Sequence, residues 1–213
     1  MTKLMMLSAG AVVAAALVAG CSNPSTDGSA DATTATSAAA TPQAPGQADN
    51  SAHNDADVMF AQHMIPHHQQ AVEMSDVLLA KPGIDARVTE LATQIKGAQA
   101  PEIAQMQGWL KLWGNPPMPP MPQQGHGDMG HGDMPAMQGM VSEADMTALR
   151  NAQGAEAAKL YLTHMIAHHE GAITMAQDEI KDGQYPAAVE MARTIVKTQQ
   201  QEIDTMHQIL GSL

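Results

Sequence analysis

The feature that most constrains this chain is a stretch of histidines and methionines that occurs twice. Residues 60–74 read FAQHMIPHHQQAVEM, and residues 161–175 read YLTHMIAHHEGAITM. A second segment repeats as well, because residues 90–110 (ELATQIKGAQAPEIAQMQGWL) match residues 190–210 (EMARTIVKTQQQEIDTMHQIL). A chain with two copies of the same pair of segments is predicted to build the same local structure twice.

Apolar residues recur with the period of a helix in four stretches, and no stretch alternates with the period of a strand. The third stretch is expected to break near Gly154, because glycine weakens a helix. Two similar helical hairpins with apolar faces most simply pack together as a four-helix bundle. We therefore expect an all-α domain over 53–213, with hairpin one over 55–113, a linker over 114–141 and hairpin two over 142–213.

The N-terminus is typical of an exported protein. Residues 1–20 contain one lysine followed by apolar and small residues, as in a secretory signal peptide. The sequence VAGC ending at Cys21 resembles the lipobox of bacterial lipoproteins, which implies cleavage before Cys21 and lipid on its sulfur. An uncleaved membrane anchor is the alternative, but the apolar run is shorter than the roughly 20 residues that span a membrane. We expect a protein anchored by lipid to the outer face of the cytoplasmic membrane.

Composition narrows the function further. Residues 21–52 contain almost no large apolar side chain, so they are predicted to form a disordered tether. The formal net charge of −12 makes a nucleic-acid partner a poor candidate. Cys21 is the only cysteine. A site for a soft metal would therefore depend on methionine sulfur and imidazole, which suits an oxidising compartment.

The histidines of the first copy fall on or beside the face that their helix must bury. On a helical wheel, His68 lies in the middle of the apolar arc beside Met64. His67 and Met74 lie together on one flank of this arc, with His63 at its margin. The second copy repeats this arrangement.

Glu102 and Glu202 occupy the apolar faces of the second and fourth predicted helices. A carboxylate on a buried face is costly unless it is paired. One interpretation is that each glutamate only satisfies buried histidines through hydrogen bonds. The other is a metal site in which imidazole and thioether are ligands and glutamate is a ligand or supports one. The candidate ligands are His63, Met64, His67, His68, Met74, Glu102 and Met106 in hairpin one, and His164, Met165, His168, His169, Met175, Glu202 and Met206 in hairpin two.

The linker is rich in proline, glycine, methionine and histidine, and it is predicted to be disordered. Thioether sulfur prefers Cu(I), whereas imidazole also suits Cu(II). The linker therefore offers a second, weaker set of copper ligands, although an ordinary mobile linker is the alternative. Its candidates are Met118, Met121, His126, Met129, His131, Met134, Met137 and Met140.

The segments HMIPHHQQAVEM and HMIAHHEGAITM, with the two Q-x-x-E-I-x-x-M segments, resemble the bacterial family called domain of unknown function 305. The resemblance covers roughly residues 52–213. It implies a ferritin-like bundle, and it implies a copper role, because the family includes secreted copper-binding proteins. By the same resemblance, six residues stand at the motif positions of the family: His67, His68, Met74, His168, His169 and Met175.

Three function classes follow. The first is a copper-binding lipoprotein that sequesters copper, delivers it or provides tolerance to it, using Cu(I), Cu(II) or both. Its partners would be the membrane, through lipid on Cys21, and another copper-handling protein. The second is a metal-free interaction or structural lipoprotein whose histidines are structural or sense pH. The third is a ferritin-like oxidase, which is disfavoured because no E-x-x-H sequence occurs in the chain. We therefore expect no enzymatic activity.

Overall fold

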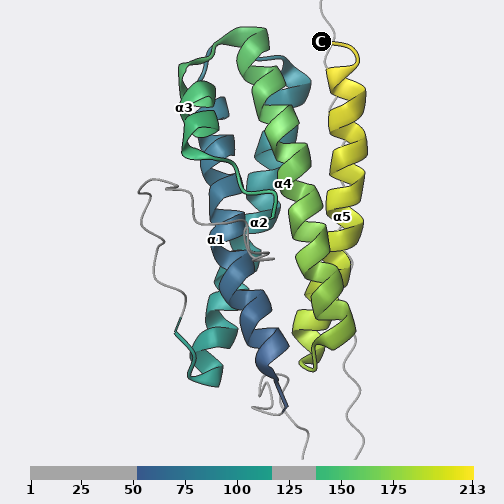
Figure 1. Ribbon diagram of the computed structural model, residues 1–213. Helices are drawn as coiled ribbons and strands as arrows, with labels where there is room; N and C mark the ends of the chain where they lie inside the picture. Colours follow the sequence, from purple (N-terminus) through teal and green to yellow (C-terminus); the bar gives the residue numbers. More distant parts are fainter. Residues whose placement is uncertain (1–51, 117–137) are drawn as a thin grey trace, which may run out of the picture. The chain divides into compact units, whose positions relative to one another are not determined.

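The computed structural model describes residues 52–116 and 138–213, and all regular secondary structure in these two ranges is α-helical (Figure 1). This confirms the predicted all-α fold. Cys21, the predicted signal peptide, all of the predicted tether except residue 52, and most of the linker lie outside the described residues. The helices are α1 (Asp55–Leu79), α2 (Ala86–Trp113), α3 (Glu143–Asn151), α4 (Gly154–Asp182) and α5 (Pro186–Leu210).

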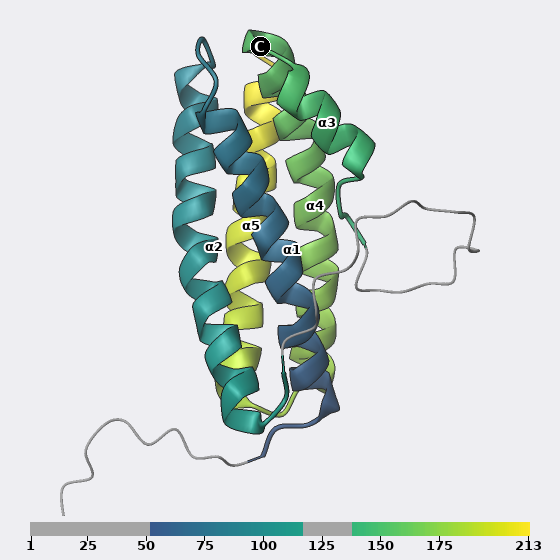
Figure 2. The same ribbon diagram turned by 90° about the vertical axis from the view of Figure 1, so that its left-hand side faces the viewer.

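The four long helices form two antiparallel hairpins. Helix α1 packs mainly on α2 and α4 mainly on α5, and the hairpins meet along α1 and α4, with a smaller contact between α2 and α5. Figures 1 and 2 show the short α3 against one end of α1 and α4. The third periodic stretch is thus two helices, so the domain has five helices in its described part. The break lies at Ala152 and Gln153, which are extended, and α4 begins at Gly154 with φ 53°.

Local sequence accounts for several helix ends. Asn54 starts α1 with a capping box, because its side chain accepts from the Asp57 N–H while the Asp57 carboxylate accepts from the Asn54 N–H. Ser142 caps α3 with its hydroxyl group, which accepts a hydrogen bond from the Asp145 N–H. Gly114 ends α2 in the left-handed region, with φ 74°, where glycine carries no steric penalty.

The apolar core consists of two clusters. The Tyr161 cluster, which includes Met74, Leu78, Leu149 and Tyr161, lies near the end that carries α3. The Trp109 cluster, which includes Phe60, Trp109 and Met175, lies toward the other end. Between them along every long helix is a band of buried polar residues, here called the central polar layer: His67, His68, Gln99, His168, His169 and Gln199. The core is therefore divided by polar groups that come from both copies of the repeat.

Candidate functional site

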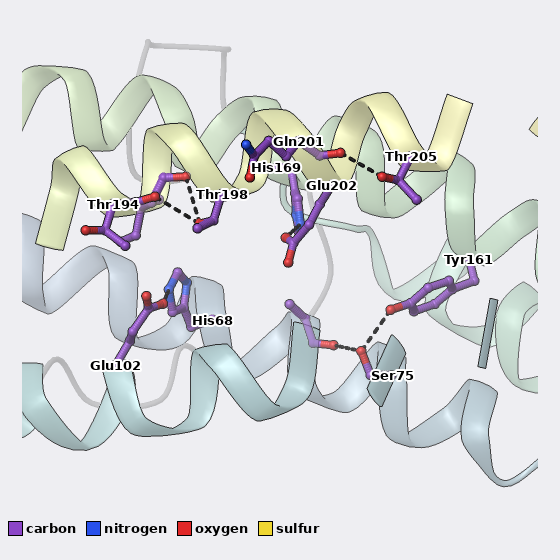
Figure 3. A network of polar contacts seen from close by, with 12 residues as sticks. His68, Ser75, Glu102, Tyr161, His169, Thr194, Thr198, Gln201, Glu202 and Thr205 are labelled. Carbon is purple, nitrogen blue, oxygen red and sulfur yellow. Dashed lines mark hydrogen bonds and ion pairs between the residues drawn. The ribbon is translucent and has the colours of Figure 1, made fainter. Parts of the chain in front are cut away.

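Two histidines of the central polar layer pair with glutamates, one pair in each hairpin (Figure 3). The Nε2 atom of His68 on α1 lies 2.8 Å from Oε2 of Glu102 on α2. In the second hairpin, Nε2 of His169 on α4 lies 2.7 Å from Oε2 of Glu202 on α5. Both imidazoles are fully buried, whereas each carboxylate is 19% exposed. The glutamates thus lie at the edge of the core rather than within it.

These pairs fix which ring nitrogen is free. An Nε2–H that donates to the carboxylate leaves the lone pair on Nδ1. The Nδ1 atoms of His68 and His169 are buried and have no hydrogen-bond partner among the described residues. A histidine that donates one N–H to a carboxylate and presents its other nitrogen is the arrangement that holds metal-ligating imidazoles in place.

His67 and His168 face each other where α1 meets α4. Their ring centroids are 3.7 Å apart and their planes are tilted by 40°. Burial, with the neighbouring His68, lowers the pKa of His67 to about 3. Burial and the adjacent imidazoles also lower the pKa of His168 well below its usual value. Both rings are therefore neutral at physiological pH, and a neutral ring has a lone pair for a metal.

The end of the linker, residues 138–141, packs against this pair and is here called the strap. The Nε2–H of His67 donates to the Gln138 carbonyl oxygen at 3.2 Å. Gln70 holds the strap with two hydrogen bonds, one from its Nε2 to the Val141 oxygen (2.9 Å) and one from Val141 N to its Oε1 (2.8 Å). Gly171 allows the close approach, since a Cβ there would lie 2.0 Å from the Gln138 oxygen. The prediction of disorder over 118–140 was wrong for residues 138–140, because side chains of α1 form hydrogen bonds with the backbone of the strap.

Several polar atoms of the central polar layer have no hydrogen-bond partner within the described ranges. Both ring nitrogens of His168, Nδ1 of His67, both amide atoms of Gln99 and Oε1 of Gln199 share this property with the two Nδ1 atoms above. Each unsatisfied buried group costs roughly 1–3 kcal/mol. The layer thus contains few hydrogen bonds and several free lone pairs, and a bound cation would use these lone pairs as ligands.

The structure divides the other predicted ligands among different parts of the domain. His63 and His164 are only half-buried, and the buried methionine candidates are split equally between the two apolar clusters. Of the linker candidates, Met140 is the one within the described residues, in the strap, and the other seven lie outside. Met64, Met106 and Met175 belong to the Trp109 cluster, and Met74, Met165 and Met206 to the Tyr161 cluster.

Within residues 52–116 and 138–213, no three His, Cys, Asp or Glu side chains converge closely enough to hold a metal ion together. The pairs described above bring together two such groups each. Imidazole and thioether nevertheless form a donor set that copper accepts in both oxidation states. The free nitrogens of His67, His68, His168 and His169 therefore fit copper in their chemistry.

Sequence reasoning missed a buried carboxyl pair at the end of the bundle nearest the Trp109 cluster. Asp57 Oδ1 accepts from the backbone N–H groups of Gln184 (3.0 Å) and Tyr185 (2.8 Å). Glu179 is 2% exposed and neither of its oxygens has a donor in the described part of the chain. Burial, with the Asp57 carboxyl beside it, raises the pKa of Glu179 to about 9. The signal was available, since Glu179 stands where the other copy has Leu78.

None of the described helices combines the length and the hydropathy that crossing a membrane would require.

Comparisons of the sequence and of the structure with known proteins point to the same family. Residues 57–210 match the family described as "Domain of unknown function (DUF305)". A DUF305 fragment from Deinococcus radiodurans is 32% identical with a TM-score of 0.64, covering 76% of this chain and 100% of that one. A DUF305 protein from Streptomyces coelicolor, described as secreted, is 35% identical with a TM-score of 0.64, covering 74% of this chain and 91% of that one.

Structures of CopM are similar to the chain as well. The Cu(II)-bound form is 29% identical with a TM-score of 0.60, and the Cu(I)-bound form is 27% identical with a TM-score of 0.58. Each covers 73% of this chain and 96% of the CopM chain. No curated protein sequence matches this chain.

Proposed function

The chain belongs to the DUF305 family, and from this premise we propose that it is an exported lipoprotein that binds copper. In this proposal it sequesters copper, delivers it or provides tolerance to it, and it catalyses no reaction. The imidazoles of the central polar layer are the main ligands, and the buried methionines beside that layer supply thioethers. The methionines and histidines of the linker, which lie mostly outside the described residues, would add weaker sites for Cu(I).

The observation that carries this proposal is the set of free imidazole nitrogens in the central polar layer. His68 and His169 each donate one N–H to a glutamate and leave Nδ1 unpaired in the core. His67 and His168 bring further unpaired nitrogens to the same layer. Because such groups destabilise a core unless something binds them, their occurrence in both copies favours a ligand.

The comparisons support copper as that ligand. CopM, which has the same kind of bundle at 29% and 27% identity, has been solved with Cu(II) and with Cu(I). The Streptomyces relative is described as secreted, which agrees with the signal peptide read from the sequence. Lipid on Cys21 would then hold the copper sites close to the membrane, within reach of another copper-handling protein.

One observation favours the metal-free alternative. The hydrogen bonds from His68 to Glu102 and from His169 to Glu202 satisfy half of each ring without any metal. In that alternative, the histidines are structural and the protein acts through its surface. The alternative predicts that copper binds no more strongly here than to exposed histidines.

Counting bound ions separates the two functions. The metal-depleted protein is titrated with Cu(II) in air and with Cu(I) under anaerobic conditions, and retained copper is measured after gel filtration. We expect at least one tightly held ion per chain and a rise in melting temperature, because a ligand that binds the folded state stabilises it. No retained copper of either oxidation state would overturn the proposal.

A pair of matched variants locates the site. His67→Gln/His168→Gln removes two imidazoles from the central polar layer and is expected to lose the copper-dependent rise in melting temperature. The control is His207→Gln, which changes an exposed histidine on α5. An unchanged copper response in the double variant would place binding outside this layer.

A further inference from the structure

A cavity of about 420 Å³ lies between the first turns of α1 and the last turns of α4. These turns of α1 and α4 are at the lower end of the bundle in Figure 1, close to the turn from α4 to α5. The lining of the cavity combines thioethers, an imidazole and carboxylates with the apolar side chains of Ala56 and Phe60. The thioethers, the imidazole and the carboxylates belong to Met59, His63, Met175, Asp178, Glu179 and Asp182. No lysine or arginine of the described residues lines the cavity.

Glu179 distinguishes this cavity from an ordinary cluster of exposed acidic residues, because it is buried. Its side chain is 2% exposed, it lines the cavity, and neither oxygen accepts a hydrogen bond from the described residues. The neighbouring Asp57 uses the donors nearby, because its carboxylate accepts from three backbone N–H groups. A buried carboxyl group that lines a cavity and accepts no hydrogen bond is a group that a bound cation would satisfy.

The internal repeat provides a comparison within the same molecule. The corresponding region at the opposite end of the bundle joins the first turns of α4 to the last turns of α1. There the imidazole and one buried methionine are kept, as His164 and Met74. The other chemistry is replaced: Leu160 stands for Met59, Val77 for Asp178, Leu78 for Glu179 and Lys81 for Asp182. The fold itself therefore does not require these four side chains, and Leu78 is fully buried in the Tyr161 cluster.

We propose that this end cavity is a second cation site, specific for Cu(I), in which the imidazole of His63 and the thioethers of Met59 and Met175 are ligands. Glu179 is protonated in the metal-free protein, and it releases its proton when the ion binds, so that its carboxylate then balances the charge of the ion. The exposed Asp178 and Asp182 attract the ion to the mouth, where the carbonyl end of α4 also favours positive charge. Met59 is 53% exposed and Met175 is 7% exposed, so the two sulfurs lead from the surface toward the core.

The chemistry of the lining residues favours a soft monovalent ion over a hard divalent ion. Divalent hard ions require several oxygen ligands together, whereas the carboxylates here do not converge with His63 into a three-ligand group. Cu(I) accepts few ligands and prefers thioether sulfur with imidazole. Burial lowers the pKa of His63, which keeps its ring neutral and able to bind. The proposal rests on the copper-binding function above and adds a site that is separate from the central polar layer.

The test counts Cu(I) ions per chain by anaerobic titration of the metal-depleted protein against a coloured Cu(I) chelator. Met59→Leu and Glu179→Gln are each expected to lose one equivalent of Cu(I), with Cu(II) binding unchanged. Met146→Leu and Glu170→Gln are the matched controls, because Met146 lies in α3 far from the cavity lining and Glu170 is exposed on α4. Both controls are expected to retain every equivalent.

A second measurement covers the case in which Glu179→Gln disturbs folding. With methyl-labelled methionine, Ag(I), a redox-stable substitute for Cu(I), is expected to shift the Met59 and Met175 signals of the unaltered protein. Full Cu(I) stoichiometry in Met59→Leu together with unshifted methyl signals would overturn this site. If His67→Gln/His168→Gln then still lost copper, the proposed function would stand without the end cavity. If the unaltered protein bound no copper, both would fall.

Discussion

The imidazole rings of His67 and His168 pack against each other across the contact between α1 and α4, with 3.7 Å between their centroids. The two residues occupy the same position in the two copies of the repeat. The interface between the hairpins therefore places a repeated residue against its own counterpart. This contact joins the two His–Glu pairs into one layer, since His68 and His169 are the next residues along each helix.

Acid is expected to destabilise the metal-depleted protein sharply below pH 6.5. The pKa of His67 is about 3 in the folded protein against 6.5 for an ordinary histidine, so the unfolded state binds a proton that the folded state does not. Stability is then complete above pH 6.5 and is lost as the pH falls, by about 3 kcal/mol at pH 4.5 for this residue alone. His168 acts in the same direction. Urea unfolding at pH 7.0, 5.5 and 4.5 measures the slope, and His67→Gln/His168→Gln should flatten it.

Alkali is expected to act on Glu179 in the opposite sense. The pKa of Glu179 is about 9 in the folded protein and near 4.5 in the unfolded chain. The folded state thus keeps a proton that the unfolded state releases, so stability falls as the pH rises between these values, by about 1.4 kcal/mol per pH unit. Glu179→Gln removes this loss, and its melting temperature should exceed that of the unaltered protein more at pH 8 than at pH 5. A constant difference across this range would contradict the assignment.

Gly171→Ala is expected to displace the strap. A Cβ at residue 171 would lie 2.0 Å from the Gln138 oxygen, so the bond from His67 to Gln138 would break and the domain should lose roughly 1–3 kcal/mol. Gly97→Ala and Gly108→Ala are the controls, because nothing lies within 4 Å of a Cβ at either position in α2. These two changes should instead stabilise the protein by about 0.5–1 kcal/mol. Denaturant unfolding measures all three, and equal effects would show that the strap contact is unimportant.

The two His–Glu pairs should behave as equivalents in the metal-depleted protein. Glu102→Leu leaves the His68 N–H buried without its acceptor and should cost roughly 1–3 kcal/mol. Glu202→Leu should cost a similar amount through His169. Adding His68→Leu to Glu102→Leu should recover part of the loss, because both partners are then apolar. Additive losses in this double-mutant cycle would mean that the pair is not coupled.

Cys21→Ser tests the anchoring that is proposed from the sequence. Without the sulfur there is nothing to carry lipid, so the protein should either leave the membrane fraction or accumulate as unprocessed precursor. Cell fractionation followed by mass spectrometry of the N-terminus measures both outcomes. A variant that stays in the membrane fraction at the mature size would exclude lipid on Cys21 as the anchor.

The sequence alone determined the helices and their buried faces. Helical period depends on the spacing of apolar residues along one segment, and the repeat made each hairpin predictable from the other. The same reasoning placed Glu102 and Glu202 beside histidines, and the structure pairs them with His68 and His169. Within a hairpin, the short turn limits how far one helix can slide along the other. Residues that face each other across the two helices can therefore be predicted from the sequence.

Tertiary structure alone decided which histidines meet between the hairpins. A wheel assigns His67 and His168 to a flank, but only the packing of α1 on α4 brings these flanks together. The strap contact at Gln138 likewise depends on a segment that carries no helical period.

The sequence marks Glu179 as a carboxylate at the position of Leu78 in the other copy, but its pairing with Asp57 was decided by tertiary structure for the same physical reason. The partners of Asp57 are the backbone N–H groups of Gln184 and Tyr185, which lie 127 and 128 residues further along the chain. Periodicity measures what one helix presents to its surroundings, and it contains no information on the distance between groups from different helices. The sequence therefore determined which chemical groups this protein buries, and the packing of one hairpin on the other decided which of them are in contact.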